Sequence, residues 1–398
     1  MTIEAAADVA KGGGITYGMV GGGRGAFIGS VHRKAIAMDG LADLAAGCFS
    51  NDFENTLETG ASLGLPPDRL YKDYRQMIRA EAKRADRLDF LVIVTPNALH
   101  YPIAKLALEN GLHVMCDKPL ATSSTDARAL GALAKKKGSL FGVTYAYAGY
   151  PMVRHMREMV AGGELGDIRF VAAEYPQDWL ATALESTGQK QAAWRTDPKR
   201  AGISNCVGDI GSHIENVVAR VTGLEIRSLL ARLDRFGEGR TLDDNASILL
   251  EYKGGAKGVY WSSQIAVGSD NGLRVRIYGT KASLEWAQED PNYCRVAYVG
   301  KPTVRLSRGR DALHPAAARM SRLPSGHPEG YFECFANIYA SFIAAVRKKR
   351  AGERLTAEDL DFPDVDDGIR GVRFIEHCVA SSRKGAAWVK FQSLAARR

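Results

Sequence analysis

Residues 15–27 read ITYGMVGGGRGAF, in which a short apolar run leads into a cluster of glycines. The run has the length of a buried strand, and Gly21-x-Gly23-x-x-Ala26 satisfies the pattern G-x-G-x-x-A, which opens a helix in dinucleotide-binding folds. In that pattern the first glycine allows a tight turn, and the second lets the backbone approach the pyrophosphate of the dinucleotide. The third small residue lets helix and strand pack closely. A plain glycine turn is the alternative. The cluster predicts dinucleotide contacts at Gly21, Gly23, Arg24, Ala26 and Phe27.

The length and composition of the chain indicate two globular domains. Its 398 residues exceed one ordinary domain, and a content of 45% hydrophobic and 25% charged residues excludes disorder of the whole chain. No apolar run approaches the ~18 residues that a membrane span needs. The net charge of +8 could indicate that the protein binds nucleic acid. However, the basic clusters at 135–137 and 347–350 are short and stand where helices should end, a position that favours cations. We therefore expect neither nucleic acid nor membrane as a partner.

The six cysteines occur without a C-x-x-C pair or zinc-finger spacing. We expect free, mostly buried thiols, no metal site, and a reducing, cytoplasmic location. Residues 1–14 are small and polar, end in three glycines and carry no secretion signal, so we expect a flexible tail there.

Strand-like apolar runs alternate with helix-like segments up to about residue 148. The runs lie at 15–20, 45–49, 90–94, 112–116 and 140–145. This alternation predicts a doubly wound parallel sheet, an α/β Rossmann domain over residues 15–148. From about residue 165, successive strand-like runs have few helices between them, which predicts an α+β domain over 149–398 with a large, open, mostly antiparallel sheet. Residues 287–324 are expected to be mostly loop, with one or two strands.

The end of the second predicted strand bears on the choice of dinucleotide. Ser50 stands where an acid usually holds the adenine ribose of NAD, and Asp52 comes two residues later. No arginine follows directly to receive the 2′-phosphate of NADP. The pattern favours NAD and leaves NADP open.

Two further motifs follow the next strands. Residues 95–100 read TPNALH, and residues 117–120 read DKPL. Both stand at carboxyl ends of predicted parallel strands, where α/β sheets bind ligands. Beside a bound dinucleotide, Lys118 can donate a hydrogen bond to a substrate oxygen. The alternative is a surface lysine before a turn-forming proline.

Asp209 and His213 stand four residues apart at the start of a predicted helix, in the sequence GDIGSHIENVV of residues 208–218. Residues at this spacing share a helix face. A histidine with a carboxylate one turn away is suited to proton transfer near neutral pH. A capping aspartate with a buried structural histidine is the alternative.

Taken in order, these motifs resemble those of the Gfo/Idh/MocA oxidoreductases, which carry a glycine fingerprint, T-P-N-x-x-H, E-K-P-L and a D-x-x-x-H helix. The resemblance covers residues 15–385. It implies hydride transfer to a nicotinamide cofactor, with His213 as the base and Lys118 stabilising the reacting oxygen. Asp209 would position Lys118 and the substrate, and neither metal nor flavin is required. We further expect cofactor contacts at Ser50, Thr95, Pro96, Asn97, His100, Asp117, Lys118, Trp194 and Arg195.

The chain departs from the family pattern at a few positions. Asp117 replaces the usual Glu, and Asn216 stands where many members have Asp. The glycine loop is about three residues longer, which makes Gly29 an alternative third glycine.

The expected substrate pocket combines aromatic faces with polar groups, which suits a ring polyol or a sugar. Its residues are Lys118, Tyr145, Tyr147, Gln177, Trp179, Asp209, His213 and His327. Residues 142–149, 194–198 and 326–330 look most like a subgroup near the inositol dehydrogenases. The resemblance thus implies oxidation of scyllo- or myo-inositol to a ketoinositol with NAD, with side activity on aldohexoses such as glucose.

Two alternatives remain, a pyranose or anhydrosugar dehydrogenase or reductase using NAD(P)(H), and an NAD(P)-sensing regulator without turnover. The resemblance also implies a homotetramer or homodimer formed through the C-terminal sheet.

Overall fold

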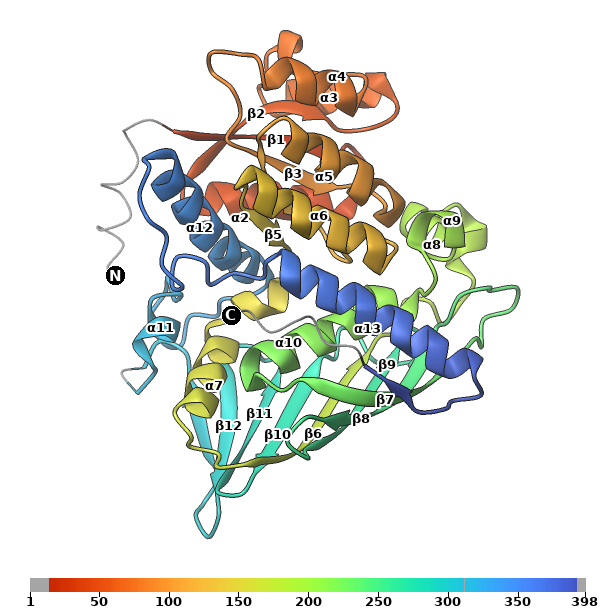
Figure 1. Ribbon diagram of the computed structural model, residues 1–398, viewed down its shortest axis with the longest axis vertical. Coiled ribbons are helices and arrows are strands. Elements are labelled where there is room, and N and C mark those ends of the chain that lie inside the picture. Colours follow the sequence, from red (N-terminus) through yellow and green to blue (C-terminus); the bar gives the residue numbers. More distant parts are fainter. Residues whose placement is uncertain (1–13, 311, 392–398) are drawn as a thin grey trace. The chain divides into compact units, whose positions relative to one another are not determined.

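The computed structural model describes residues 14–310 and 312–391, which fall into two compact units (Figure 1). The first unit consists of residues 14–146 and 331–369, and the second of residues 147–330 and 370–391 without residue 311. Residues 1–13 of the expected tail lie outside the described residues.

The first unit is built on a parallel sheet of five strands in the order β2-β1-β3-β4-β5. The strands are β1 (Ile15–Gly21), β2 (Ala42–Cys48), β3 (Phe90–Val94), β4 (His113–Cys116) and β5 (Phe141–Val143). A parallel bridge from Gly47 to Leu70 adds a rudimentary strand beyond β2. The chain order therefore reverses next to β1, which is where doubly wound sheets bind ligands. The predicted Rossmann architecture is confirmed.

The helices of this unit lie on both faces of the sheet (Figure 1). The helices are α2 (Phe27–Met38), α3 (Phe53–Ser62), α4 (Tyr74–Glu81), α5 (His100–Glu109), α6 (Ser124–Lys137) and α12 (Tyr331–Arg350). Helix α6 shows why the sequence begins and ends it there. The Ser123 side chain accepts a hydrogen bond from the backbone N–H of Asp126, and Gly138 ends the helix in the left-handed conformation at φ 63°.

The core of the first unit includes residues from both of its chain segments. Phe90 stacks on Tyr17 and meets Phe342 of α12 edge-on, with ring centroids 5.3 and 5.4 Å apart. The backbone N–H of Val143 donates to Pro363 at 2.8 Å. The sequence pattern places residues 331–369 in the second domain, whereas these contacts attach them to the first unit. The reason is that an amphipathic helix shows which face it buries but not against which partner.

The second unit contains a nine-stranded sheet in the order β13-β12-β11-β10-β6-β9-β8-β7-β14. Its strands are β6 (Ile168–Pro176), β7 (Ile226–Asp234), β8 (Asn245–Tyr252), β9 (Lys257–Ser263), β10 (Arg274–Gly279), β11 (Ala282–Ala287), β12 (Tyr293–Tyr298), β13 (Val304–Ser307) and β14 (Val389–Lys390). All neighbours pair antiparallel except β6 and β9, which are parallel. The expected open, mostly antiparallel sheet is confirmed, and residues 287–324 contain β12 and β13.

Helices α7 (Pro151–Ala161) and α10 (Ser212–Thr222) pack against this sheet, α10 over β6 and α7 over β11 and β12. The remaining helices are α8 (Lys190–Arg195), α9 (Pro198–Ala201), α11 (Pro315–Ala318) and α13 (Val365–Arg383), which continues from the first unit.

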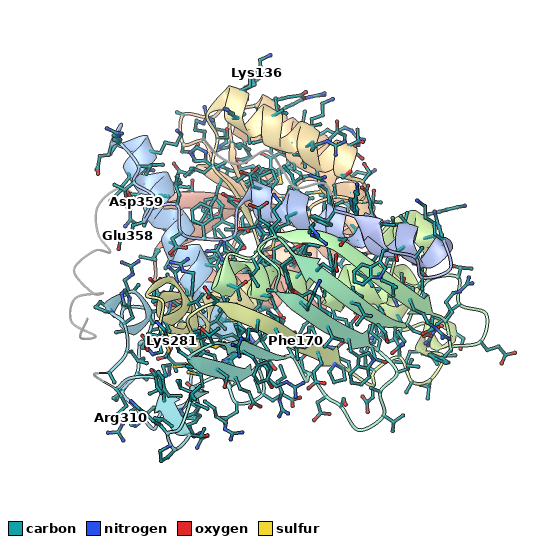
Figure 2. All side chains as sticks on the ribbon, turned by 60° about the horizontal axis from the view of Figure 1, so that its bottom comes forward. Lys136, Phe170, Lys281, Arg310, Glu358 and Asp359 are labelled. Atoms are coloured by element: carbon teal, nitrogen blue, oxygen red, sulfur yellow. The ribbon has the colours of Figure 1, made fainter. Side chains whose placement is uncertain are left out.

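The opposite face of the sheet exposes large apolar side chains. Phe170, labelled in Figure 2, pairs with Tyr278 across the β6–β10 ladder, so both side chains lie on this face. Leu249 joins them through the β8–β9 and β9–β6 register. These three side chains, 39–46% exposed, define the exposed sheet face. No helix in the described residues is both long and apolar enough to cross a membrane.

Candidate functional site

The glycine cluster forms a turn that only glycine tolerates. Gly21, Gly22 and Gly25 have φ angles of 88°, 77° and 82°, in the left-handed region. A Cβ atom on Gly21 would lie 2.7 Å from the carbonyl oxygen of Val94, and one on Gly23 would lie 2.4 Å from Oδ1 of Asn55. The turn therefore brings bare backbone to the carboxyl edge of the sheet.

The close contact between strand and helix is made by Gly29. A Cβ atom on Gly29 would lie 2.3 Å from Cα of Gly22, a distance that real atoms do not adopt. Ala26 instead precedes α2 as its N-terminal flanking residue. The alternative third glycine of the sequence analysis thus takes the packing position, because the loop is longer than the short fingerprint.

The beginning of α2 suits an anionic group. Ala26 supplies no side-chain cap, and the first turn of α2 contains no acidic residue, whereas α3, α4 and α6 are capped by Asp52, Asp73 and Ser123. Backbone N–H groups and the positive end of the helix dipole remain for a pyrophosphate. The glycine turn and this helix start fit a dinucleotide.

The acidic residue that follows β2 caps a helix. The Asp52 carboxylate accepts a hydrogen bond from the N–H of Glu54 at 3.1 Å as the cap of α3, and the Ser50 hydroxyl accepts from the N–H of Asp52 at 3.1 Å. Arg24 is largely exposed and pairs with Glu58 at 2.8 Å. Asp52 is thus engaged as a helix cap, and Ser50 remains the residue expected at the adenine ribose.

His100 joins the loops that follow β3 and β4. Its Nδ1 lies 2.8 Å from the carbonyl oxygen of Pro119, and its Nε2 lies 2.9 Å from that of Thr95. Burial lowers the pKa of His100, so the neutral ring donates to one of these oxygens at a time. These contacts indicate that His100 shapes the edge of the sheet. The hydroxyl of Thr95, buried and with no hydrogen-bond partner among the described residues, is a group that a dinucleotide could satisfy.

The Asp117 carboxylate fixes the turn that carries Lys118. Its Oδ1 accepts hydrogen bonds from the backbone N–H of Lys118 and from the hydroxyl of Thr144, both at 2.8 Å. Lys118 is half-buried, and Asn97 and Tyr145 of the same unit are buried. A substitution of Glu by Asp therefore keeps a carboxylate that organises this loop.

In the second unit, Asp209 lies in a π-helical turn, Val207–Gly211, that leads directly into α10. Such turns are rare and occur frequently at functional sites. His213, on the first turn of α10, is buried, and its ring centroid lies 4.7 Å from that of Tyr147. Asp209 and His213 thus lie on adjacent turns, the first of them π-helical.

A hydrogen-bonded group of polar side chains surrounds Tyr147. Its hydroxyl bonds that of Tyr175, whose ring lies 6.3 Å from His213. Oδ1 of Asn271 accepts from the Tyr175 hydroxyl at 2.6 Å and from Nε2 of Gln177 at 2.7 Å. Tyr175 and Asn271 are not among the pocket residues that the sequence predicts. Tyr175 stands on β6 two residues before Gln177, a spacing that was the available signal, whereas Asn271 lies on a loop with no motif.

Arg195 lies between two tryptophans and one carboxylate. Its guanidinium carbon lies 4.3 Å from the ring centroid of Trp194 and 5.8 Å from that of Trp179, and Nε is 3.2 Å from Oδ2 of Asp209. These contacts connect two residues expected at the cofactor to Asp209 of the same unit.

His327 is exposed, and its carbonyl oxygen accepts a hydrogen bond from the buried Arg308. Arg308 also pairs with Glu329 at 2.8 Å, and both side chains are 2% exposed. The loop that presents His327 is therefore held from within the second unit. No group of three or more His, Cys, Asp or Glu side chains among residues 14–310 and 312–391 could hold a metal ion.

Comparisons with known proteins agree with this geometry. Residues 15–145 match the NAD-binding Rossmann fold of an oxidoreductase family, and residues 153–285 match a GFO/IDH/MocA C-terminal domain. An uncharacterised oxidoreductase of Bacillus subtilis is 39% identical over 95% of this chain and 97% of its own length.

Two solved structures of inositol dehydrogenase homologues from Azotobacter vinelandii are also similar. One, in complex with NAD⁺, is 39% identical, with a TM-score of 0.92, and the match covers 95% of this chain and 97% of that one. The other, with NADH and myo-inositol, is 38% identical, with a TM-score of 0.88 and coverage of 95% and 98%. With its fingerprint turn, lysine motif and Asp–His helix on these two domains, the chain belongs to the Gfo/Idh/MocA family of NAD-dependent oxidoreductases.

Proposed function

We propose that this protein oxidises a ring polyol, with scyllo- or myo-inositol as the favoured substrate, to the corresponding ketone. The observation that carries the proposal is the polar group beside His213. Two tyrosine hydroxyls, an amide of Asn271 and an amide of Gln177 form one hydrogen-bonded set next to the imidazole ring. Several such donors and acceptors on aromatic faces are what a ring bearing many hydroxyls requires for recognition.

The family roles of Lys118, Asp209 and His213 suit this reaction. When bound, NAD supplies the hydride acceptor at its nicotinamide ring. His213 takes the proton that leaves the substrate hydroxyl, because a neutral imidazole accepts protons near pH 7. Lys118 donates a hydrogen bond to a substrate oxygen and stabilises its developing negative charge. Asp209 orients the substrate through its carboxylate.

Two single substitutions test these roles. Lys118→Ala and His213→Ala should each lower turnover by at least ~10²-fold, the range expected for loss of charge stabilisation or general base catalysis. Both variants should still bind NADH, which its fluorescence follows. Near-normal turnover in both variants would contradict the catalytic roles of Lys118 and His213.

The substrate is tested by following absorbance at 340 nm, with NAD and NADP each offered separately to inositols, aldohexoses and an anhydrosugar. Reduction of NAD by an inositol is the expected result. Activity with aldoses or the anhydrosugar alone would move the enzyme to the sugar dehydrogenases and leave the roles of Lys118 and His213 in place. Binding of NADH without turnover of any polyol or sugar would favour the regulator alternative.

We also propose that the chain forms a homotetramer or homodimer through the exposed sheet face of the second unit. Phe170, Leu249 and Tyr278 give this face large apolar side chains, which a monomer leaves in water at a cost. Light scattering should give a mass two or four times 43.1 kDa, and a monomer mass would contradict the proposal.

All six cysteines are buried and free, which favours the reducing environment of the cytoplasm.

A further inference from the structure

We propose that Gln264 is a positioning residue that holds Asp209 as a fixed carboxylate. The consequence for catalysis rests on the proposed function, because it requires Asp209 to act on the substrate, whereas the contact itself stands on the geometry of the second unit.

Gln264 follows β9 and is completely buried. Its Nε2 donates to Oδ2 of Asp209 at 3.0 Å, and Nε of Arg195 donates to the same oxygen at 3.2 Å. The backbone of Gln264 is tied at both ends, since its N–H donates to the carbonyl oxygen of Asp244 and its own carbonyl oxygen accepts from Leu180, each at 2.9 Å. The amide is therefore presented to Asp209 from a rigid base.

The orientation of this amide is set by a second residue. Nδ2 of Asn205 donates to Oε1 of Gln264 at 2.7 Å. If the amide were flipped, two N–H₂ groups would face each other and a carbonyl oxygen would face the carboxylate, so the network admits one orientation. Asn205 is buried, and its backbone N–H donates to Oδ1 of Asp243 at 3.1 Å.

Asp243 anchors the turn that precedes Asp209. Its Oδ2 accepts from the hydroxyl of Ser204 at 2.9 Å and from the N–H of Val207 at 3.0 Å. The chain of contacts thus runs from Asp243 through Asn205 and Gln264 to Asp209, and every link is a hydrogen bond inside one unit.

This arrangement selects the charged form of Asp209. The positively charged guanidinium of Arg195 and the amide N–H₂ of Gln264 both donate to Oδ2, and a carboxylate accepts such hydrogen bonds more strongly than a neutral carboxyl group does. Within the second unit, the charged or titratable groups around Asp209 include Arg195 on α8, His213 on α10, the Cys206 thiol, whose raised pKa has the Asp209 charge as one of its causes, and, behind Asn205, Asp243. Arg195 supplies the positive charge, and Gln264 fixes the orientation of the Asp209 carboxylate, because two donors on one oxygen prevent its rotation.

The substitution Gln264→Glu tests the contact without reference to activity. It places a second carboxylate against Asp209, and two such groups cannot both ionise at this distance. Thermal unfolding, followed by tryptophan fluorescence, should show a lower midpoint at pH 8, by ~4 °C or more, and a smaller deficit at pH 5. Adding Asp209→Asn should recover most of the loss, because the new amide at 209 then donates to the new carboxylate at 264. Additive losses in the double variant would overturn the inference.

Kinetics test the positioning role. With myo-inositol and NAD, Gln264→Glu should move the acidic limb of the pH profile of kcat/KM upward by about one pH unit or more. Its kcat at pH 6 should fall about tenfold or more, with a smaller change in KM. Gln288→Glu is the matched control, because Gln288 is also buried but its amide bonds Tyr150, and it should keep the acidic limb of the unmodified protein.

The outcomes separate this inference from the proposed function. An unmodified protein that oxidises no polyol, together with recovery in the double variant, would overturn the proposed function and support the carboxylate contact. Recovery with an unshifted acidic limb would make Gln264 a structural residue only and overturn the positioning role.

Discussion

Acidification from pH 7 to pH 4 should destabilise the first unit through His32. This residue is fully buried on α2, where its Nδ1 lies 2.6 Å from the hydroxyl of Tyr339 on α12, and its ring meets that of Phe335 edge-on at 5.0 Å. Burial lowers the pKa of His32 from 6.5 to about 4, an effect that Asp117 opposes and Arg33 reinforces. The folded unit therefore keeps this imidazole neutral.

The sign and size of the effect follow from linkage. Between pH 6.5 and about 4, the unfolded chain binds a proton at His32 that the folded chain does not, so the free energy of unfolding decreases as the pH falls. The separation of the two pKa values corresponds to about 3 kcal/mol, because one pH unit is worth about 1.4 kcal/mol. This contribution is complete above pH 6.5 and is lost by about pH 4.

Hydrogen exchange of peptides from α2 and α12 measures this loss in the unit where it occurs. The control is His32→Gln, whose side-chain carbonyl can still accept from the Tyr339 hydroxyl but does not titrate. Comparing both proteins at each pH cancels the intrinsic pH dependence of exchange. It also cancels the contribution of His113, whose pKa burial likewise lowers to about 4. Parallel loss of protection in the two proteins would refute the reasoning.

Two further substitutions test packing and buried charge. Gly29→Ala should weaken NADH binding and lower the free energy of unfolding by about 1–3 kcal/mol, because the new Cβ would overlap Gly22. The control is Gly330→Ala, where a Cβ atom meets nothing within 4 Å. Equal behaviour of the two variants would contradict the packing argument. Arg308→Met should destabilise the second unit by about 3–5 kcal/mol, because it leaves the buried Glu329 carboxylate without its cation. Tryptophan fluorescence reports this unfolding, since all five tryptophans lie in the second unit, and an unchanged midpoint would show that the ion pair is dispensable.

Local patterns were sufficient to predict the first sheet. The run at 90–94 has only apolar residues and became β3, which is buried along its whole length, because a central parallel strand meets helices on both faces. The glycine cluster predicted the turn after β1, since three of its residues need φ angles that other residues rarely adopt.

Contacts between distant segments could not be predicted in the same way. Nothing in the sequence of residues 331–350 specifies α2 as the partner of α12, because many apolar faces would satisfy the same helix. Gln264 and Asn271 are likewise single polar residues without a motif, and their importance depends on which side chains the folded chain brings to them.

The division of the first unit into two chain segments has a consequence during synthesis. The ribosome makes residues 14–146 first and then the whole of 147–330 before α12 emerges. At ~5–20 residues per second, this interval lasts ~10–40 s. Throughout it, the nascent sheet lacks the helix that packs on α2 and contacts His32 through Phe335 and Tyr339, so an apolar surface stays open to chaperones and to neighbouring nascent chains. A gene fragment that ends before residue 331 would encode the strands and glycine turn of the nucleotide unit without the helix that completes its core.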